Sequence, residues 1–369
     1  MKKIALESIL DCMVQSGASD CYITVGAPVA LRIDGTVRFL EMEELLEEDT
    51  EDLIKESLTD HQLVEFYDKQ ELNIGIYFKA FGRFRVNVFR QRGMIGMVIR
   101  RIKQYIPSLA ELNLPDRLKD FIMLKSGLVL VVGPTGSGKT TTLASLINYR
   151  NETQSGHILM LEDPIEYYHE HKKSIITQRE IGLDTLDFKV GLKNALRQAP
   201  DVILIGEIRD TETMETAIHV ALTGHLCLAT LHSPNVVQTL ERVLNFFEPA
   251  RHSQLLVDLS TCLKGIIAQR LIPSAKCGRV PAVEVLVDSP RIKDLILKRR
   301  FEEIPDAIEK SSNYGMISFD QHLYELYVSG LISLEDALSH AESQNNLRLK
   351  IKMNQEKNFG KSKSQFKLL

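Results

Sequence analysis

The spacing of apolar residues near the start of the chain changes from that of a helix to that of short strands. Apolar side chains at positions 4, 6, 9, 10, 13 and 14 recur at helical spacing up to Gly17, so we predict a helix over residues 3–15. Short apolar runs then predict strands at 21–25, 29–33 and 37–40. Asp34-Gly35 can supply the positive φ that a tight hairpin turn needs, and an acidic, helix-like stretch follows at 41–58.

Residues 74–80 and 83–90 predict two further strands, joined at Phe81-Gly82. In the second strand, apolar residues at positions 84, 86 and 88 alternate with the polar residues Arg83, Arg85, Asn87 and Arg90. Successive side chains of a strand point to opposite faces, so the alternation puts a basic row on one face. A solvated strand face is the alternative to a functional one.

The second part of the chain has continuous apolar runs instead of alternation. They predict strands at 128–132, 157–161, 202–205 and 225–230. Helical patterns separate these runs, for example at 187–198 and 211–222. Unbroken apolar strands are typical of parallel sheets that helices cover on both faces. We therefore predict an α/β nucleotide-binding domain.

Prolines at 107 and 115 indicate a break between the two regions. We predict an N-terminal domain at 1–104, a linker at 105–115 and a second domain with C-terminal helices at 116–347. From residue 348 onward, Glu356 is the only acidic residue, whereas basic residues occur at 348, 350, 352, 357, 361, 363 and 367. This pattern predicts a basic, disordered tail at 348–369, with contact to membrane lipids as the alternative.

Composition limits the classes of function. The chain has 369 residues, 44% of them hydrophobic and 25% charged, and a formal net charge of −4, which argues against a nucleic-acid-binding protein. No apolar run approaches the roughly 20 residues that cross a bilayer, and Glu7 and Asp11 interrupt the first apolar stretch. We expect a cytoplasmic protein. The five cysteines form no C-x-x-C pair, so we expect buried free thiols and no zinc site.

A phosphate-binding loop follows the run at 128–132. The sequence GPTGSGKT at 133–140 matches G-x-x-x-x-G-K-[ST] and leads into a helical pattern at 141–149. Backbone N–H groups of such a loop surround phosphates, while Lys139 is expected to reach the β- and γ-phosphates and Thr140 to hold Mg²⁺. The expected ATP-binding residues are Gly133, Thr135, Gly136, Ser137, Gly138, Lys139, Thr140 and Thr141.

Acidic residues close two of the other apolar runs. The run at 202–205 leads through Gly206 to Glu207, a suitable carboxylate near a bound Mg²⁺. The run at 157–161 leads to Glu162 and Asp163, either of which could polarise an attacking water. A polar turn and a helix-capping cluster are the respective alternatives. His225 and His232 bracket the strand at 226–231, so we expect only one of them to face the γ-phosphate.

Four motifs in one order resemble the secretion-ATPase superfamily. They are the Walker A sequence GPTGSGKT at 133–140, the Asp box LEDPIEY at 161–167, the Walker B sequence DVILIGEIRD at 201–210 and the His box TGHLCLATLHS at 223–233. The resemblance extends to GASD at 17–20 and GRFRV at 82–86. It implies a RecA-like P-loop ATPase domain preceded by a smaller PAS-like α+β domain.

The resemblance also implies roles for individual residues. Glu162 would be the catalytic glutamate, Glu207 the Walker B carboxylate that holds Mg²⁺ together with Thr140, and His232 a sensor of the γ-phosphate. Arg83 and Arg100 of the first domain, with Arg85 as a weaker candidate, would complete the ATP site. Guanidinium groups there would neutralise charge on the transferred phosphoryl group.

Within the superfamily the chain resembles the PilT/PilU type of type IV pilus retraction ATPases, and PilU more than PilT. It lacks the four-cysteine element of pilus-extension and type II secretion ATPases. The implied function is a hexameric ATPase motor for pilus retraction and twitching motility, acting at the inner membrane through a platform protein. Because RIKDLILK at 291–298 only partly matches a PilT motif needed for retraction, an accessory subunit that depends on a PilT-like ATPase is the alternative. A nucleic-acid translocase is a further one.

Overall fold

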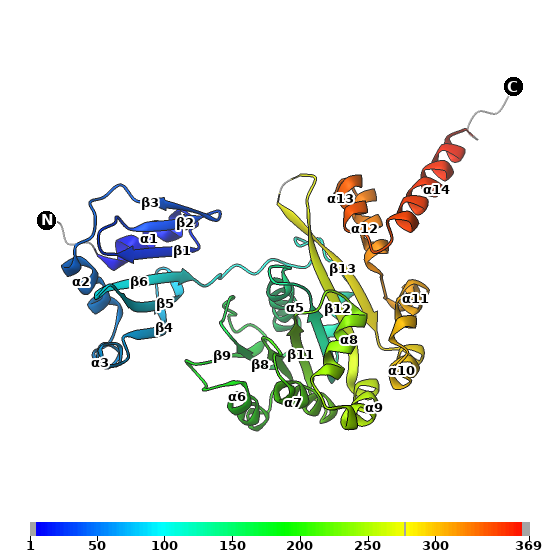
Figure 1. Cartoon of the computed structure of the whole chain (residues 1–369), viewed down its shortest axis with the longest axis horizontal. Helices are drawn as coiled ribbons and strands as arrows, with labels where there is room; N and C mark the ends of the chain where they lie inside the picture. Colours follow the sequence, from blue (N-terminus) through cyan, green and yellow to red (C-terminus); the bar gives the residue numbers. More distant parts are fainter. Residues whose placement is uncertain (1–4, 277, 364–369) are drawn as a thin grey trace. The chain divides into compact units, whose positions relative to one another are not determined.

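The computed structural model describes residues 5–276 and 278–363, with side chains up to Met353 (Figure 1). The chain divides into two compact units. Unit 1 comprises the described residues of Met1–Tyr105 together with Ile165–Tyr168 and Gly182–Asp184. Unit 2 comprises Ile106–Pro164, His169–Ile181 and the described residues from Thr185 onward. The last three residues of the Asp box, 165–167, therefore belong to unit 1, whereas its first four belong to unit 2.

Unit 1 is built on an antiparallel sheet, six-stranded over the described residues, in the order β3-β2-β1-β6-β5-β4. Its strands are β1 (Asp20–Thr24), β2 (Ala30–Ile33), β3 (Thr36–Phe39), β4 (Glu71–Phe78), β5 (Gly82–Gln91) and β6 (Met94–Arg101). Its helices are α1 (Leu6–Gln15), α2 (Glu47–Ser57) and α3 (Asp60–Lys69). Asp34 and Gly35, with φ values of 49° and 80°, make the predicted turn between β2 and β3.

One face of this sheet packs with the helices into a single core. Phe84, Val86 and Val88 of β5 lie in that core with Leu10 of α1 and Phe66 of α3. The residues that alternate with them on β5 are only partly buried. The predicted division of this strand into an apolar and a basic face is therefore confirmed over residues 83–88. Arg90, which was predicted to belong to the basic row, lies instead on the same face as Val88, because alternate residues of a strand share a face.

Two elements of unit 1 were not predicted. Helix α3 buries only Phe66, so its sequence has little apolar periodicity. It begins at Asp60, and the side chain of the preceding Thr59 caps it by accepting from the N–H of Gln62. The predicted stretch at 41–58 forms α2 only from Glu47 onward. Strand β6 lacks polar alternation because apolar residues lie on both of its faces in MIGMVI.

Unit 2 is built on a seven-stranded sheet, counted over its described part, in the order β13-β12-β7-β11-β10-β8-β9. All neighbouring strands are parallel except β12 and β13. The strands are β7 (Gly127–Val132), β8 (Gly156–Glu162), β9 (Ser174–Glu180), β10 (Val202–Ile205), β11 (Leu226–Leu231), β12 (Leu263–Pro273) and β13 (Arg279–Val287).

Helices precede, connect and follow these strands (Figure 1). They are α4 (Leu118–Ile122), α5 (Lys139–Thr153), α6 (Phe188–Ala195), α7 (Thr211–Leu222), α8 (Val236–Asn245), α9 (His252–Cys262), α10 (Pro290–Leu297), α11 (Ile304–Glu309), α12 (Phe319–Val328), α13 (Leu334–Ser339) and α14 (Gln344–Lys363). Short 3₁₀ turns lie at Leu196–Gln198, Pro249–Arg251, Phe301–Glu303 and Ser312–Tyr314.

Alternate residues of β7 enter two different cores. Leu128, Leu130 and Val132 pack with residues of α7, α8 and α9, whereas Val129 and Val131 pack with residues of α4 and α5. Both faces of the strand are thus covered by helices, which explains its unbroken apolar sequence. The predicted RecA-like α/β architecture, preceded by a smaller α+β domain, is confirmed.

The boundaries of the domains in the structure differ from the predicted boundaries of the linker and the tail. Leu109 and Leu114, inside the predicted linker at 105–115, are buried in the core of unit 2. Apolar burial, which the two prolines did not reveal, makes this segment part of the domain. The predicted tail boundary at 348 falls inside α14, because Leu347 and Ile351 are buried one helical turn apart. Residues 364–369 lie outside the described residues.

Cys21, Cys227 and Cys262 are buried free thiols, as predicted, whereas Cys12 is a free thiol that is only half-buried. Cys277 lies outside the described residues. Burial raises the pKa of Cys21 and Cys262 to about 12, which makes both thiols poor nucleophiles. In the part of the chain that the structure describes, no helix combines the length and apolar character needed to span a membrane.

Candidate nucleotide site

The topology of unit 2 gathers the four sequence motifs at one edge of its sheet. Strands β7, β11, β10 and β8 are adjacent and parallel, so their carboxyl ends meet at the same edge. The phosphate-binding loop follows β7, His232 follows β11, Glu207 follows β10, and Glu162 ends β8. Open α/β sheets bind their ligands at this edge.

The loop after β7 has the backbone of an anion-binding nest. Gly136 and Gly138 have φ values of 75° and 88°, a region that residues with a Cβ rarely adopt, and α5 begins at Lys139. The ammonium of Lys139 donates to the carbonyl oxygens of Gly133, at 2.9 Å, and Pro134, at 3.1 Å. Backbone N–H groups of such a loop, together with the helix N-terminus, attract phosphate.

The other predicted loop residues differ in their exposure. Thr135 and Gly136 are exposed, whereas Thr140 and Thr141 are half-buried. The hydroxyl of Ser137 is buried and has no hydrogen-bond partner in the described part of the chain. A buried polar atom in this position fits a ligand rich in hydrogen-bond acceptors, such as the phosphates of ATP.

The Walker B carboxylate is held from both sides. Glu207 Oε1 lies 2.7 Å from Nε2 of His232, and its Oε2 lies 2.6 Å from Nη2 of Arg209. Arg209 also reaches Asp163, with 3.4 Å between Nη1 and Oδ2. The structure thus brings together predicted residues of the Asp box, Walker B and His box, and Arg209 joins two of these motifs.

Glu162 lies beside this cluster and is only 5% exposed. Its Oε1 accepts a hydrogen bond of 3.0 Å from Nε2 of Gln178 on β9. Gln178 in turn accepts from the backbone N–H of His169. At Gly206 the backbones of β10 and β8 approach so closely that an added Cβ would lie 3.1 Å from Cα of Glu162. Glu162 and Glu207 are therefore neighbours across two strand ends.

The two histidines that bracket β11 lie at opposite ends of it. The carbonyl oxygen of His225 accepts from the N–H of Gly127, where β7 begins. His232 follows the other end and pairs with Glu207. Of the two, only His232 therefore lies at the phosphate-loop edge, and its contact with the γ-phosphate stays a prediction.

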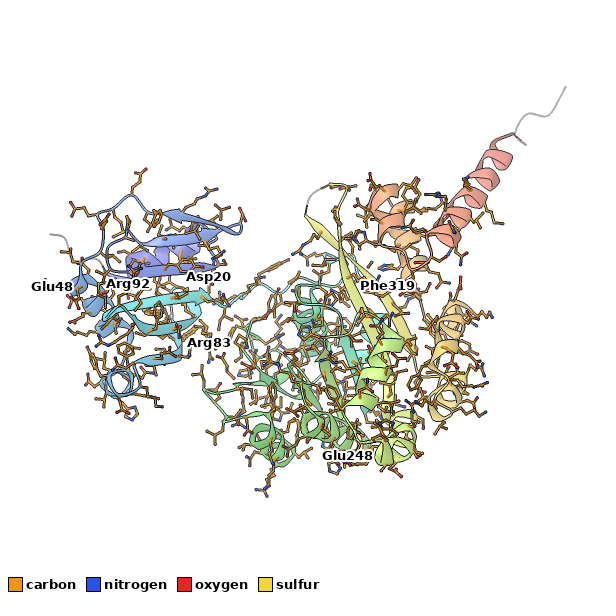
Figure 2. The ribbon with its side chains drawn as sticks, in the orientation of Figure 1. Asp20, Glu48, Arg83, Arg92, Glu248 and Phe319 are labelled. Atoms are coloured by element: carbon orange, nitrogen blue, oxygen red, sulfur yellow. The ribbon has the colours of Figure 1, made fainter. Side chains whose placement is uncertain are left out.

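The candidate arginines of unit 1 lie on one face of its sheet. Arg100 of β6 is opposite Arg85 of β5, and the guanidinium of Arg83 lies against Gly75 of β4. Arg100 Nε donates to Asp20 Oδ1 at 2.7 Å, and Asp20 is only 4% exposed (Figure 2 labels Asp20 and Arg83). Their contribution to an ATP site stays a prediction.

Two residues that contact the motifs were given no role in the sequence analysis. Arg209 lies inside the Walker B sequence between Glu207 and Asp210, and a basic residue flanked by two carboxylates was a usable signal. Gln269 of β12 is 2% exposed and hydrogen-bonded to the phosphate loop. Its signal was an amide directly after the apolar run Ile266-Ile267-Ala268, because buried polar side chains normally have a specific partner.

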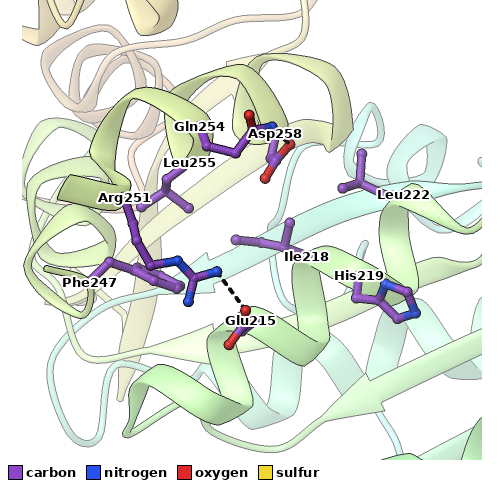
Figure 3. A pocket seen from close by; sticks show the side chains of 9 residues that line it. All are labelled: Glu215, Ile218, His219, Leu222, Phe247, Arg251, Gln254, Leu255 and Asp258. Atoms are coloured by element: carbon purple, nitrogen blue, oxygen red, sulfur yellow. Dashed lines mark hydrogen bonds and ion pairs between the residues drawn. The ribbon is translucent and has the colours of Figure 1, made fainter. Parts of the chain in front are cut away.

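Two hollows on unit 2 differ in their relation to these motifs. A cavity of about 340 Å³ has Asp163, Glu207 and Arg209 in its wall and adjoins the cluster. A second hollow of about 170 Å³ lies between α7 and α9, where Arg251 is paired with Glu215 (Figure 3). None of the four motifs contributes a residue to the second hollow.

Comparison with known proteins places these motifs in a family. The model for the family described as type II/IV secretion system protein matches residues 2–315. The chain is 48% identical over 351 residues to the type IV pilus ATPase PilU of Pseudomonas aeruginosa, covering 95% of this chain and 92% of PilU. It is 38% identical over 341 residues to the retraction ATPase PilT of the same organism, covering 92% of this chain and 99% of PilT.

A solved structure gives the same result for the fold. The crystal structure of the pilus retraction motor PilT with bound ADP matches with a TM-score of 0.86 and 40% sequence identity, over 94% of this chain and 99% of that chain. The predicted resemblance to PilT/PilU-type ATPases, closer to PilU, is confirmed by these identities. The chain belongs to the type II/IV secretion system protein family.

Proposed function

We propose that this chain is an ATP hydrolase that powers type IV pilus retraction and twitching motility. The observation that carries the proposal is the convergence of four motifs at the carboxyl edge of β7, β11, β10 and β8. Similarity over nearly the full length to proteins named as pilus ATPases, and to a PilT structure with bound ADP, supports it.

The phosphate loop would bind the triphosphate of ATP. The loop from Gly133 to Gly138 offers backbone N–H groups, and the side chains of Ser137, Thr140 and Thr141 and the N-terminus of α5 add further donors. Lys139, whose ammonium now bonds to loop carbonyls, would transfer its hydrogen bonds to phosphate oxygens. The loop would thereby align the terminal phosphate for in-line attack.

Thr140 and Glu207 are the residues that would hold Mg²⁺, which supplies positive charge against the phosphate oxygens when bound. Glu162, fixed by Gln178, would orient and polarise the attacking water. His232 would report on the γ-phosphate through its contact with Glu207. The protein thus contributes positioning and charge stabilisation rather than a covalent intermediate.

Arg83 and Arg100, with Arg85 as a weaker candidate, would bring positive charge from unit 1 to the phosphates. Closure of the two units would then depend on the bound nucleotide. We further propose a homo-hexameric ring that passes this motion to an inner-membrane platform protein, because force on a polymer requires sites that act in turn.

The second candidate function is that of an accessory ring subunit that depends on a PilT-like ATPase. The higher identity to PilU than to PilT favours it, and so does the partial match to the PilT motif, which lies on α10 and the one residue after it. The two candidates share the site chemistry and differ in whether the chain moves pili alone.

Hydrolysis is tested by steady-state ATP turnover across a range of protein concentrations, with the mass followed by light scattering. We expect turnover to rise as hexamers form. Lys139→Ala and Glu207→Ala are each expected to abolish it. Lys69→Ala, which removes an exposed lysine outside the motifs, serves as the matched control. A wild-type chain without turnover, or a Lys139→Ala variant with full turnover, would overturn the proposal.

Pilus retraction is tested separately in cells. The chain is expressed in a pilus-bearing host that lacks both of its PilT- and PilU-type ATPases, and in one that lacks only the PilU type. Twitching restored in both hosts supports an autonomous motor, whereas twitching restored only where PilT remains supports the accessory subunit. Restoration in neither host contradicts the assignment to pilus retraction.

A further inference from the structure

A buried glutamine lies beneath the phosphate loop. Gln269 is part of β12, which pairs with β7 in parallel, and it is 2% exposed in a strand of otherwise apolar inward-facing residues. Burying an amide costs free energy unless both of its polar atoms find partners. The partners of Gln269 therefore indicate what it does.

Both polar atoms of the amide bind residues of the phosphate-loop region. Nε2 donates to the carbonyl oxygen of Ser137 at 2.7 Å, and Oε1 accepts from the hydroxyl of Thr142 at 2.7 Å. Ser137 belongs to the loop, and Thr142 belongs to the first turn of α5. The amide of Gln carries a donor and an acceptor on separate atoms of one planar group, so one side chain can make both of these hydrogen bonds.

The hydrogen bond to Ser137 sets the direction of one peptide group in the loop. In a trans peptide the C=O and the following N–H point to opposite sides. Because the carbonyl of Ser137 points to Gln269, the N–H of Gly138 points away from β12. If the Ser137–Gly138 peptide were flipped, the carbonyl oxygen of Ser137 would face the side that the N–H of Gly138 now faces. A carbonyl oxygen there would repel phosphate.

Close contacts with the same residue explain two of the loop glycines. A Cβ added at residue 138 would lie 2.8 Å from Nε2 of Gln269. A Cβ added at residue 133 would overlap the carbonyl oxygen of Gln269. The loop is thus in contact with β12 at both of its ends, and only residues without a side chain fit there.

We propose that Gln269 is a positioning residue for phosphate binding, because it holds the Ser137–Gly138 peptide with its N–H turned away from β12. This inference rests on the proposed ATPase function. Gln269 acts through the backbone of the loop, so its loss is expected to weaken binding of the phosphates and to leave the rest of the fold in place.

The test compares Gln269→Met, which keeps the length of the side chain and removes both hydrogen bonds, with Thr239→Val. Thr239 is fully buried on α8 and donates to the carbonyl of Asn235, so its replacement removes a buried hydrogen bond away from the loop. Binding of ADP and of adenosine to the full chain is measured by calorimetry or competition, with thermal unfolding in the absence of nucleotide.

The expected result is that Gln269→Met loses ADP affinity by about tenfold, the effect of one hydrogen bond, with no change in the weak binding of adenosine. Thr239→Val is expected to keep ADP affinity at a similar unfolding temperature. ADP affinity equal to wild type in Gln269→Met, or an equal loss in Thr239→Val, overturns the inference.

A second variant serves if Gln269→Met does not fold. Thr142→Val removes only the hydrogen bond to Oε1 of Gln269. It is expected to lower ADP affinity by about threefold, the low end of the effect of one hydrogen bond. Unchanged ADP affinity in Thr142→Val would count against the inference. A wild-type chain that binds no ADP overturns the proposed function. If the wild-type chain hydrolyses ATP and Gln269→Met equals it in ADP affinity, only this inference is overturned.

Discussion

The imidazole of His232 and the carboxylate of Glu207 lie 2.7 Å apart, Nε2 to Oε1, although the two residues are 25 positions apart in sequence (232 minus 207). They meet because β11 and β10 are adjacent parallel strands, and His232 and Glu207 follow their carboxyl ends within two residues. Arg209 holds the second oxygen of the same carboxylate. The position of Glu207 is therefore set by protein contacts in the absence of a ligand.

Replacement of Glu207 by Gln tests the role of its charge. The amide keeps the shape and the contact with His232 but removes the negative charge that would hold Mg²⁺. We expect ATP turnover to fall by about two orders of magnitude or more, with ADP affinity within about threefold of wild type. Phosphate release and equilibrium ADP binding measure the two quantities. Turnover above about a tenth of wild type would contradict this role.

Arg209→Met tests whether the bridge between Glu207 and Asp163 matters for hydrolysis. The arginine side chain is 59% exposed, so its ion pairs contribute little to stability. We expect kcat to fall by about tenfold, because Glu207 loses one of its two supports, with an unfolding temperature close to wild type. Arg242→Met, which removes another exposed arginine of unit 2, is the control. An unchanged kcat would show that His232 alone holds the carboxylate.

Arg100→Ala separates a structural role of this arginine from a role at the nucleotide. Asp20 is buried, but it also accepts from the hydroxyl of Ser19, at 2.8 Å, and lies 3.6 Å from Nε of Arg32. Loss of Arg100 should therefore lower the free energy of unfolding by no more than about 1 kcal/mol. We expect kcat to fall by at least about tenfold, as for a lost charge contact to the phosphoryl group.

Urea unfolding of Arg100→Ala checks the first value and phosphate release checks the second. Arg32→Ala, which removes the other arginine near Asp20, is the matched control and is expected to retain turnover. A variant that loses stability and turnover together, or loses neither, would argue against a direct role of Arg100 in hydrolysis.

Glu284 on β13 gives a prediction for pH. It is 3% exposed and accepts from the N–H of Val236 at 2.8 Å, and burial raises its pKa from 4.5 to about 7. The folded chain thus binds this proton more tightly than the unfolded chain. The resulting stability is complete below about pH 4.5 and is lost as the pH rises through about 7.

We therefore expect the stability advantage of wild type over Glu284→Gln to shrink as the pH rises from about 5 to 7, by up to about 1.4 kcal/mol per pH unit. Burial lowers the pKa of His322 to about 4, which has the opposite sign, but this effect is common to both proteins and cancels in the difference. Urea unfolding at several pH values measures the difference. A difference that does not change with pH would show that Glu284 does not titrate in this range.

Local sequence was sufficient where one segment carries the whole signal. The phosphate loop was predictable because its glycines, Lys139 and Thr140 lie within eight positions, between a strand and a helix. The two faces of β5 were predictable because a strand alternates its side chains whatever it pairs with. Helix α3 and the linker leucines were not, since their burial depends on distant residues.

By itself, the sequence determined the α/β class, the order of the four motifs and the residue types available for phosphate chemistry, because each of these depends on short-range patterns. Only the tertiary structure placed β11 between β7 and β10, and so set His232 against Glu207. It also brought Gln269, more than 100 positions along the chain from Ser137, under the phosphate loop. Strand order and long-range hydrogen bonds arise from packing among distant segments, and no local pattern encodes them.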